Sequence, residues 1–293
     1  MFKAAPSFLS LEELRDFIPP ALLKCLVSVQ DLARASNLST HRLYKAPLGL
    51  YAKGNLALLK RPGIAIIGTR KPNQYTRQLS ALLASELVKR GFVILSGGAL
   101  GVDSIAQASS GKNSILVSPA GLDIAYPREN QALFDRLGRE GLLLSEYGEG
   151  FRPRRHSFLE RNRIILALSL AVLVPQADLR SGSSASARLA LALKKPLFVL
   201  PHRLGESLGT QELLSRGLAR AIYDVGDFAD GLCKELGLED SMGAVEAMEG
   251  AGLLEFASQN GLFSEALEKF GSQVFEYELE GKIRRNGIYI QLN

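Results

Sequence analysis

The stretch GIAIIGTR at residues 63–70 decides the fold, because it joins a short apolar run to a glycine and a cation. An uninterrupted apolar run is typical of a strand covered on both faces, and we expect that strand over Ile64–Ile67. The next segment has helical period and ends near Gly91, a residue that tolerates the left-handed conformation of a helix end. Its apolar face consists of Leu79, Leu82, Leu83, Leu87 and Val88. Strand, glycine loop and helix in this order predict a βαβ unit.

The same switch from apolar run to helical segment recurs until about Asp224. Seven strands are predicted, at Ile64–Ile67, Phe92–Ser96, Ile115–Ser118, Leu142–Glu146, Ala171–Pro175, Leu197–Leu200 and Ala221–Tyr223. Further helices are expected over Phe158–Ser169 and Ser184–Lys194. The sequence therefore predicts an α/β fold with a doubly wound, Rossmann-type, mostly parallel sheet. In such a sheet, ligands bind beyond the carboxyl ends of the strands.

The segments on either side of this pattern have a different character. Residues 1–50 contain a helical pattern around Leu11–Arg34 and are interpreted as a helical N-terminal extension of a Rossmann-type domain at residues 51–230. Two or three short helices are then expected, over Val245–Ser258, Ser264–Phe270 and Ser272–Gly281. A hairpin over Lys282–Leu292 should follow, with Asn286-Gly287 at its turn. Helices followed by a hairpin predict a small winged-helix-like domain at residues 240–293.

The charge of the chain is unevenly distributed. Its formal net charge is +5, but the segment from Gly243 onward carries −4 and the remainder therefore carries +9. This surplus favours an anionic partner for the Rossmann-type domain, although an ordinary basic soluble protein remains an alternative. The acidic balance of the C-terminal segment disfavours duplex binding through a broad basic face there.

Cysteine usage and hydropathy indicate a cytoplasmic protein. Cys25 and Cys233 lie far apart without a nearby cysteine, so neither a disulfide framework nor a zinc site is expected. The longest apolar stretch, Ile164–Val174, is far shorter than the roughly 20 residues that span a bilayer. We therefore expect no membrane partner.

Two glycine-rich loops follow the first two predicted strands. Gly68, Thr69 and Arg70 lead into a helix, where small residues let the backbone approach a phosphate and an arginine can grip its oxygens. Gly97 and Gly98 form the second loop. Neither matches G-x-G-x-x-G or the P-loop, so dinucleotide and ATP binding lack their usual signature and no cofactor is expected. The two loops together predict a phosphate site, although a tight turn would explain the first loop equally well.

The segment from Phe151 to Arg163 places five arginines at a strand-to-helix junction. Cations that track a backbone, together with an aromatic face that stacks a base, are typical of single-strand binding. Phe158 is the candidate aromatic, with a helix-start core residue as the alternative. After the fifth strand, Arg180, Ser181, Gly182 and Ser183 repeat the design of a basic loop at a helix N-terminus.

Catalysis has little support in the sequence. None of the three histidines, His41, His156 and His202, lies near a serine or cysteine in a recognisable nucleophile motif. Asp103 and Glu146 lie near strand ends, but Asp103 suits the first turn of a helix and Glu146 is ambiguous. No cluster has metal-ligand spacing. We expect a protein that is not an enzyme and holds no metal.

The loops occur in an order that resembles the DNA-processing protein A (DprA/Smf) family over roughly Leu50–Asp224. The motifs that carry the resemblance are Ala65–Arg70, Ser96–Gly98, Gly121–Asp123 with Tyr126-Pro127 and Asn130, Ser145–Tyr147, Arg161–Ile165, and Ser181–Ser183 with Ala187-Arg188. The resemblance implies a homodimeric, single-stranded DNA-binding protein that protects incoming DNA and helps load the RecA recombinase in natural transformation. It implies phosphate contact for Arg70, a basic-pocket position for Arg155, base contact for Phe158 and a further pocket cation at Arg180.

The residues expected to bind DNA are Gly68, Thr69, Arg70, Gly97, Gly98, Arg154, Arg155, Phe158, Asn162, Arg163, Arg180, Ser181, Gly182 and Ser183. The chain departs from the family pattern in the second loop, where it has Leu100 and Gln107 in place of an arginine and a histidine. Two alternatives stay open on the sequence. One is a nucleotide-processing enzyme of the phosphoribohydrolase type, which would require a P-G-G-x-G-T loop where this chain has Pro119–Leu122. The other is a protein-protein adaptor that works through its C-terminal domain.

Overall fold

The computed structural model describes residues 6–238, 253–270, 273–279 and 281–293. The described residues divide into two compact units, with the boundary between Asp230 and Gly231. No helix in these parts of the chain is both long and apolar enough to cross a bilayer.

The first unit is built on a nine-stranded sheet with the order β1-β2-β6-β5-β4-β3-β7-β8-β9. The strands are β1 (Ser7–Ser10), β2 (Gly49–Gly54), β3 (Gly63–Ile66), β4 (Val93–Ser96), β5 (Ser114–Ser118), β6 (Leu142–Ser145), β7 (Ala171–Val174), β8 (Leu197–Val199) and β9 (Arg220–Ala221). Strands β3 to β9 are parallel to one another, while β2 is antiparallel to both β6 and β1. All seven predicted strands are present, and the predicted fold class is confirmed.

The order of the parallel strands creates one topological switch point. From β3 the chain proceeds through β4 and β5 to β6 on one side, and then crosses to β7, β8 and β9 on the other. Since β3 and β7 are adjacent, the loops that follow them diverge to opposite sides, which is where such sheets bind ligands. Strands β3 to β7 are buried along their whole length, as uninterrupted apolar runs predict for a sheet covered on both faces.

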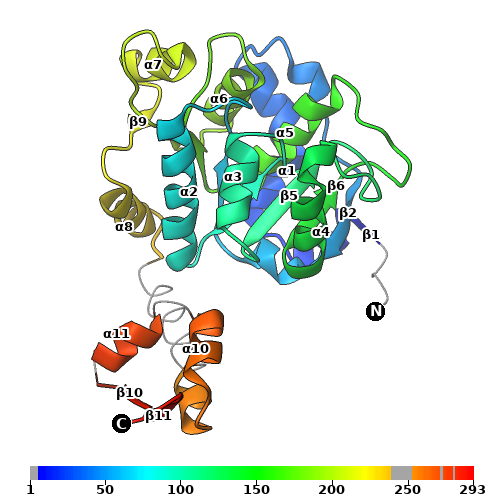
Figure 1. The fold of residues 1–293 in the computed structure, drawn as a ribbon. Coiled ribbons are helices and arrows are strands. Elements are labelled where there is room, and N and C mark those ends of the chain that lie inside the picture. Colours follow the sequence, from blue (N-terminus) through cyan, green and yellow to red (C-terminus); the bar gives the residue numbers. More distant parts are fainter. Residues whose placement is uncertain (1–5, 239–252, 271–272, 280) are drawn as a thin grey trace. The chain divides into compact units, whose positions relative to one another are not determined.

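Helices cover both faces of this sheet (Figure 1). They are α1 (Pro20–Ala35), α2 (Gln74–Lys89), α3 (Val102–Ser109), α4 (Gln131–Glu140), α5 (Ser157–Ala167), α6 (Gly182–Ala192), α7 (Leu208–Ser215) and α8 (Val225–Glu235). Helices α2, α3 and α4 contact one another in series, and α1, α5 and α6 form a second group. Short 3-10 helices η1 (Glu13–Asp16), η2 (His41–Leu43), η3 (Leu56–Lys60) and η4 (Arg128–Asn130) lie in the connections.

The N-terminal segment contributes more than the expected helices. Besides η1 and α1, it supplies the edge strand β1, which pairs with β2 from Ser7–Ala52 to Ser10–Gly49. Leu26 of α1 lies in the same buried cluster as Ile165 of α5. Strand β1 was not predicted because it has only four residues, and none of them is fully buried.

The second unit contains helices and a small antiparallel sheet. Its elements are α10 (Phe263–Phe270), α11 (Gln273–Leu279), β10 (Ile283–Asn286) and β11 (Tyr289–Leu292), and β10 pairs with β11. The two turn residues are Gly287, whose φ is +63°, and Ile288, because Asn286 is the last residue of β10 and pairs with Tyr289. The hairpin is present, but its turn lies one residue later than the predicted Asn286-Gly287 turn. The expected helix Val245–Ser258 lies within the described residues only from 253 onward, where the chain is helical.

Candidate nucleic-acid interface

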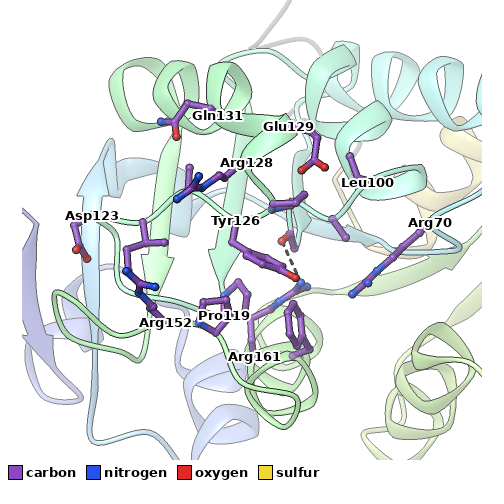
Figure 2. Close-up of a pocket in the computed structure, with 17 residues that line it drawn as sticks. Arg70, Leu100, Pro119, Asp123, Tyr126, Arg128, Glu129, Gln131, Arg152 and Arg161 are labelled. Atoms are coloured by element: carbon purple, nitrogen blue, oxygen red, sulfur yellow. Dashed lines mark hydrogen bonds between the residues drawn. The ribbon is translucent and has the colours of Figure 1, made fainter.

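A cavity of about 1100 Å³ lies over the carboxyl ends of β3, β4 and β5 (Figure 2). It is lined by residues of the loops that follow these strands, by the loop after β6 and by Phe158 and Arg161 in the first two turns of α5. The basic members of its lining are Arg70, Arg128, Arg152 and Arg161, and the aromatic members are Tyr126 and Phe158. The cavity therefore combines cations with aromatic rings at the edge where this fold binds ligands.

The loop after β3 holds Arg70 at the rim of the cavity. The backbone N–H of Thr69 donates to the carbonyl of Gln176, 3.0 Å away, which fastens this loop to the loop after β7. A Cβ on Gly68 would come within 2.7 Å of Val102, so glycine lets α3 begin close to the loop. The exposed guanidinium of Arg70 lies 5.6 Å from the centroid of the Phe158 ring. Arg70 is thus a solvent-accessible cation beside an aromatic face.

The loop after β4 forms part of the floor and contacts Arg161. The Nη2 of Arg161 donates to the carbonyl oxygen of Gly97 over 3.1 Å, and the backbone N–H of Gly97 donates to Oδ2 of Asp103 over 3.2 Å. The same Oδ2 lies 3.9 Å from Nη1 of Arg161. Any Cβ on Gly97 would overlap the Arg161 guanidinium, so glycine is required for this arrangement. The adjacent Gly98 has a φ of +68°, a conformation that favours glycine.

Arg161 is a buried cation with incomplete compensation. Its side chain is only 5% exposed, and its Nε has no hydrogen-bond partner. Burial lowers the pKa of Arg161 to about 10; the charge of Asp103 opposes this shift, whereas the charge of Arg70 adds to it. Burial likewise raises the pKa of Asp103, against the effect of Arg161 and of backbone N–H groups. Two neighbouring cations and an unused buried donor favour an anion in this cavity.

Arg161 was not among the expected binding residues, but the sequence contained a signal for it. Phe158 and Arg161 are three positions apart on α5, so they share a helical face. Phe158 is half-buried and lines the cavity, which disfavours the alternative of a core residue. The ring of Tyr126, which is 38% exposed, lies 5.4 Å from that of Phe158 at an angle of 58°. Tyr126 was also missed, and the pair forms the aromatic part of the site.

Asn162 and Arg163 lie away from the cavity, and the expected DNA contact of Arg163 is corrected. Arg163 is 2% exposed, and its guanidinium donates to the carbonyls of Lys45 and Glu160 and to the carboxylate of Glu146, at 2.6, 2.8 and 2.7 Å. A buried guanidinium that donates to these three acceptors joins α5 to the segments that carry Lys45 and Glu146. It is not available to a DNA strand in the cavity. Asn162 donates to Oγ of Ser186 at 2.7 Å, joining α5 to α6.

The remaining expected residues lie outside the cavity lining. Arg154 and Arg155 are exposed in the loop before α5, and Arg154 lies 5.6 Å from the ring centroid of Phe151. Arg180 is exposed in the loop after β7, where Ser181 caps α6 by accepting from the N–H of Ser184 at 3.1 Å. Gly182 and Ser183 form the first turn of α6. Of Arg70, Arg155 and Arg180, only Arg70 lines the cavity.

Fold and site together define a Rossmann-type protein with a basic, aromatic-lined cavity at the carboxyl edge of its sheet. The model of the DNA recombination-mediator protein A family matches residues 29–232, and the chain belongs to this family. No group of three or more histidine, cysteine, aspartate or glutamate side chains suited to a metal occurs in the described residues.

Curated relatives and solved structures agree with this membership. The chain is 37% identical over 196 residues to the DNA processing protein DprA of Bacillus subtilis, which covers 65% of this chain and 66% of that protein. It is 40% identical over 161 residues to the Protein Smf of a Synechocystis strain, over 53% of this chain and 40% of that protein. The chain thus spans between two fifths and two thirds of these relatives.

Two solved structures resemble the chain closely. The DNA processing protein A of Helicobacter pylori, described for its unique single-stranded DNA binding mode, has a TM-score of 0.68 and 44% identity, over 78% of this chain and 96% of that chain. The DprA of Streptococcus pneumoniae has a TM-score of 0.64 and 31% identity, over 77% of this chain and 74% of that chain. The predicted resemblance to the DprA/Smf family is confirmed.

Proposed function

We propose that the first unit binds single-stranded DNA at the cavity and acts by binding, without catalysis. The observation that carries the proposal is the position of two cations, Arg70 and Arg161, beside the ring pair of Tyr126 and Phe158. Cations that hold the backbone and rings that stack bases are the two components of sequence-tolerant single-strand binding. The single-stranded DNA binding described for the Helicobacter pylori relative supports the same function here.

The recessed position of the rings favours an unpaired strand. Phe158 is only half exposed and lies within a cavity, so a base must leave a duplex stack to reach it. The net charge of +9 before Gly243 supplies the electrostatic attraction for a polyanion. Duplex DNA can use that charge but not the rings, and should therefore bind more weakly at equal length.

Family membership supports a proposal for the biological role. We infer that the protein protects incoming single strands in the cytoplasm and helps load the RecA recombinase during natural transformation.

We also infer a homodimer, because Leu82 and Tyr223 expose 45% and 87% of their surface beside a common cavity of about 360 Å³ in the first unit. Sedimentation should then give about twice the 31.8 kDa mass of one chain. The second unit is proposed to be a winged-helix-like domain that contributes little to duplex binding.

A competition experiment tests the proposed function. The full chain is bound to a labelled 20-nucleotide thymidine strand and challenged with the same strand, a duplex of equal length or thymidine monophosphate. The single strand should compete best. Preference for the mononucleotide would instead support the nucleotide-processing enzyme, and equal competition by duplex would contradict the role of the rings.

Arg70→Ala provides the residue-level test, with Arg139→Ala as a matched control. Arg139 is exposed at the end of α4, at the amino edge of the sheet. Loss of one phosphate contact should make the dependence of log affinity on log salt shallower by about 0.7 in Arg70→Ala. The control should keep the wild-type slope. If both variants keep that slope, the cavity is not the binding site.

A further inference from the structure

We propose that the cavity holds two successive phosphates of one strand, the second of them at Arg128 and Arg152. This inference rests on the proposed single-strand binding. The strand would enter at Arg70 and Arg161, place a base at the Tyr126–Phe158 ring pair, and continue to the second cationic position. None of the family motifs in the sequence contains Arg128 or Arg152.

The arrangement of the lining residues supports two positions. Figure 2 shows Arg128 and Arg152 on the side of Tyr126 that faces away from Arg70. The cavity of about 1100 Å³ also slightly exceeds the roughly 300–1000 Å³ that is typical of a site for one drug-sized ligand. A single phosphate bound by Arg70 would leave the other end of this space, and both of its cations, unused.

Both cations project from backbone that is fixed by hydrogen bonds. The loop that carries Arg152 is fastened to the loop after β5, because the N–H of Gly121 donates to the carbonyl of Phe151 at 3.0 Å. Asp123 adds a second link, since its two carboxylate oxygens accept from the N–H of Gly150 at 3.1 and 3.0 Å. A site held in place before binding pays a smaller ordering cost when its ligand arrives.

Arg128 is fixed in the same way. It begins the short helix η4, whose last residue, Asn130, donates from Nδ2 to the carbonyl of Gly98 at 2.8 Å. This bond joins the second cationic position to the loop after β4, whose Gly97 carbonyl accepts a hydrogen bond from Arg161. The two phosphate positions therefore rest on one connected set of loops.

The guanidinium groups of Arg128 and Arg152 are available to a ligand. Within the parts of the chain that the structure describes, neither takes part in an ion pair or a side-chain hydrogen bond. Two carboxylates, Asp123 and Glu129, also line this end of the cavity. Asp123 is engaged by the backbone of Gly150, whereas Glu129 is exposed. Glu129 should therefore weaken phosphate binding at this position, which provides a second test.

The test compares two double variants of the full chain with equal loss of charge. One is Arg128→Ala with Arg152→Ala; the control is Lys112→Ala with Arg139→Ala, both exposed at the amino edge of the sheet. Binding of a 20-nucleotide thymidine strand is measured between 50 and 200 mM salt. Loss of two phosphate contacts should make the salt slope shallower by about 1.4, so the affinity of wild type should fall about 7-fold more than that of the variant over this range. Glu129→Gln should bind the strand more tightly than wild type.

The outcomes separate this inference from the proposed function. If the Arg128 and Arg152 variant keeps the slope of its control while Arg70→Ala loses slope, the second position is wrong and single-strand binding stands. If Arg70→Ala also keeps its slope, the proposed function fails as well. Unchanged or weaker binding by Glu129→Gln would show that no phosphate lies at this end of the cavity. Melting curves of each variant verify that the first unit is folded.

Discussion

Gly97→Ala should destabilise the first unit, because the new Cβ would overlap the guanidinium of Arg161. Gly97 does not have a positive φ, so its backbone conformation accepts an alanine. The new Cβ would overlap Nη1, Nη2 and Cζ of Arg161. Arg161 would have to leave the position in which it donates to Gly97 and lies 3.9 Å from Asp103.

The magnitude follows from the burial of the two charges. Separating a buried ion pair costs about 3–5 kcal/mol, because one charge remains without compensation. A domain of this size loses about 2–4 °C of its unfolding midpoint per kcal/mol, so the midpoint should fall by about 6–20 °C. In an Arg161→Ala background the overlap is absent. There, Gly97→Ala should change the free energy of unfolding by less than about 1 kcal/mol, in the stabilising direction.

The assay is a double-mutant cycle, followed by calorimetry and chemical denaturation of the first unit. The coupling between Gly97→Ala and Arg161→Ala should be about 3–5 kcal/mol. Gly98→Ala is the control, because its φ of +68° and a Cβ 2.7 Å from Leu116 make it destabilising in both backgrounds. Additive effects of Gly97→Ala and Arg161→Ala would refute the explanation that Gly97 exists to accommodate Arg161.

Three further predictions concern the site and the fold. Arg155→Ala should make the salt slope shallower by about 0.7 at unchanged melting temperature. Arg163→Ala should lose about 1–3 kcal/mol of stability, because the carbonyls of Lys45 and Glu160 and the carboxylate of Glu146 lose their donor; equal melting curves of these two variants would contradict this. Tyr126→Phe should bind like wild type in titrations with a single strand, and Tyr126→Ala should bind about 1–3 kcal/mol more weakly, unless the ring does not stack. Hydrogen bonds from Lys89 and Arg90 lower the pKa of Glu86, so its stabilising effect is present above the unfolded pKa of about 4.3 and is lost as the pH falls through the folded value. Glu86→Gln should therefore reduce the loss of unfolding free energy on acidification, measured by denaturant titrations at a series of pH values. An unchanged pH dependence would contradict the assignment.

The sequence predicted the elements whose residues are buried on both faces. Strands such as Ile64–Ile67 are uninterrupted apolar runs, and burial between two helical layers is the only environment that suits them. Edge strand β1 lacks that signal, since it is short and exposed on part of its surface. The loops were harder to assign, because the residue types of a loop indicate an anion site but not the direction in which the loop's side chains point. Arg180 and Arg70 follow adjacent strands, yet only Arg70 lines the cavity.

The two arginines of the Arg161–Arg163 motif show where sequence reasoning stops. Residues two positions apart on a helix are rotated by about 200°, so these two side chains must point to nearly opposite sides of α5. One therefore has to face the cavity and the other the interior, where Glu146 and Lys45 accept its hydrogen bonds. The composition of the motif cannot decide which is which. Phe158 can, because a residue three positions before Arg161 shares its face, and an aromatic assigned to a base assigns Arg161 to the same ligand. The helical phase of one side chain thus separates a binding cation from a structural one.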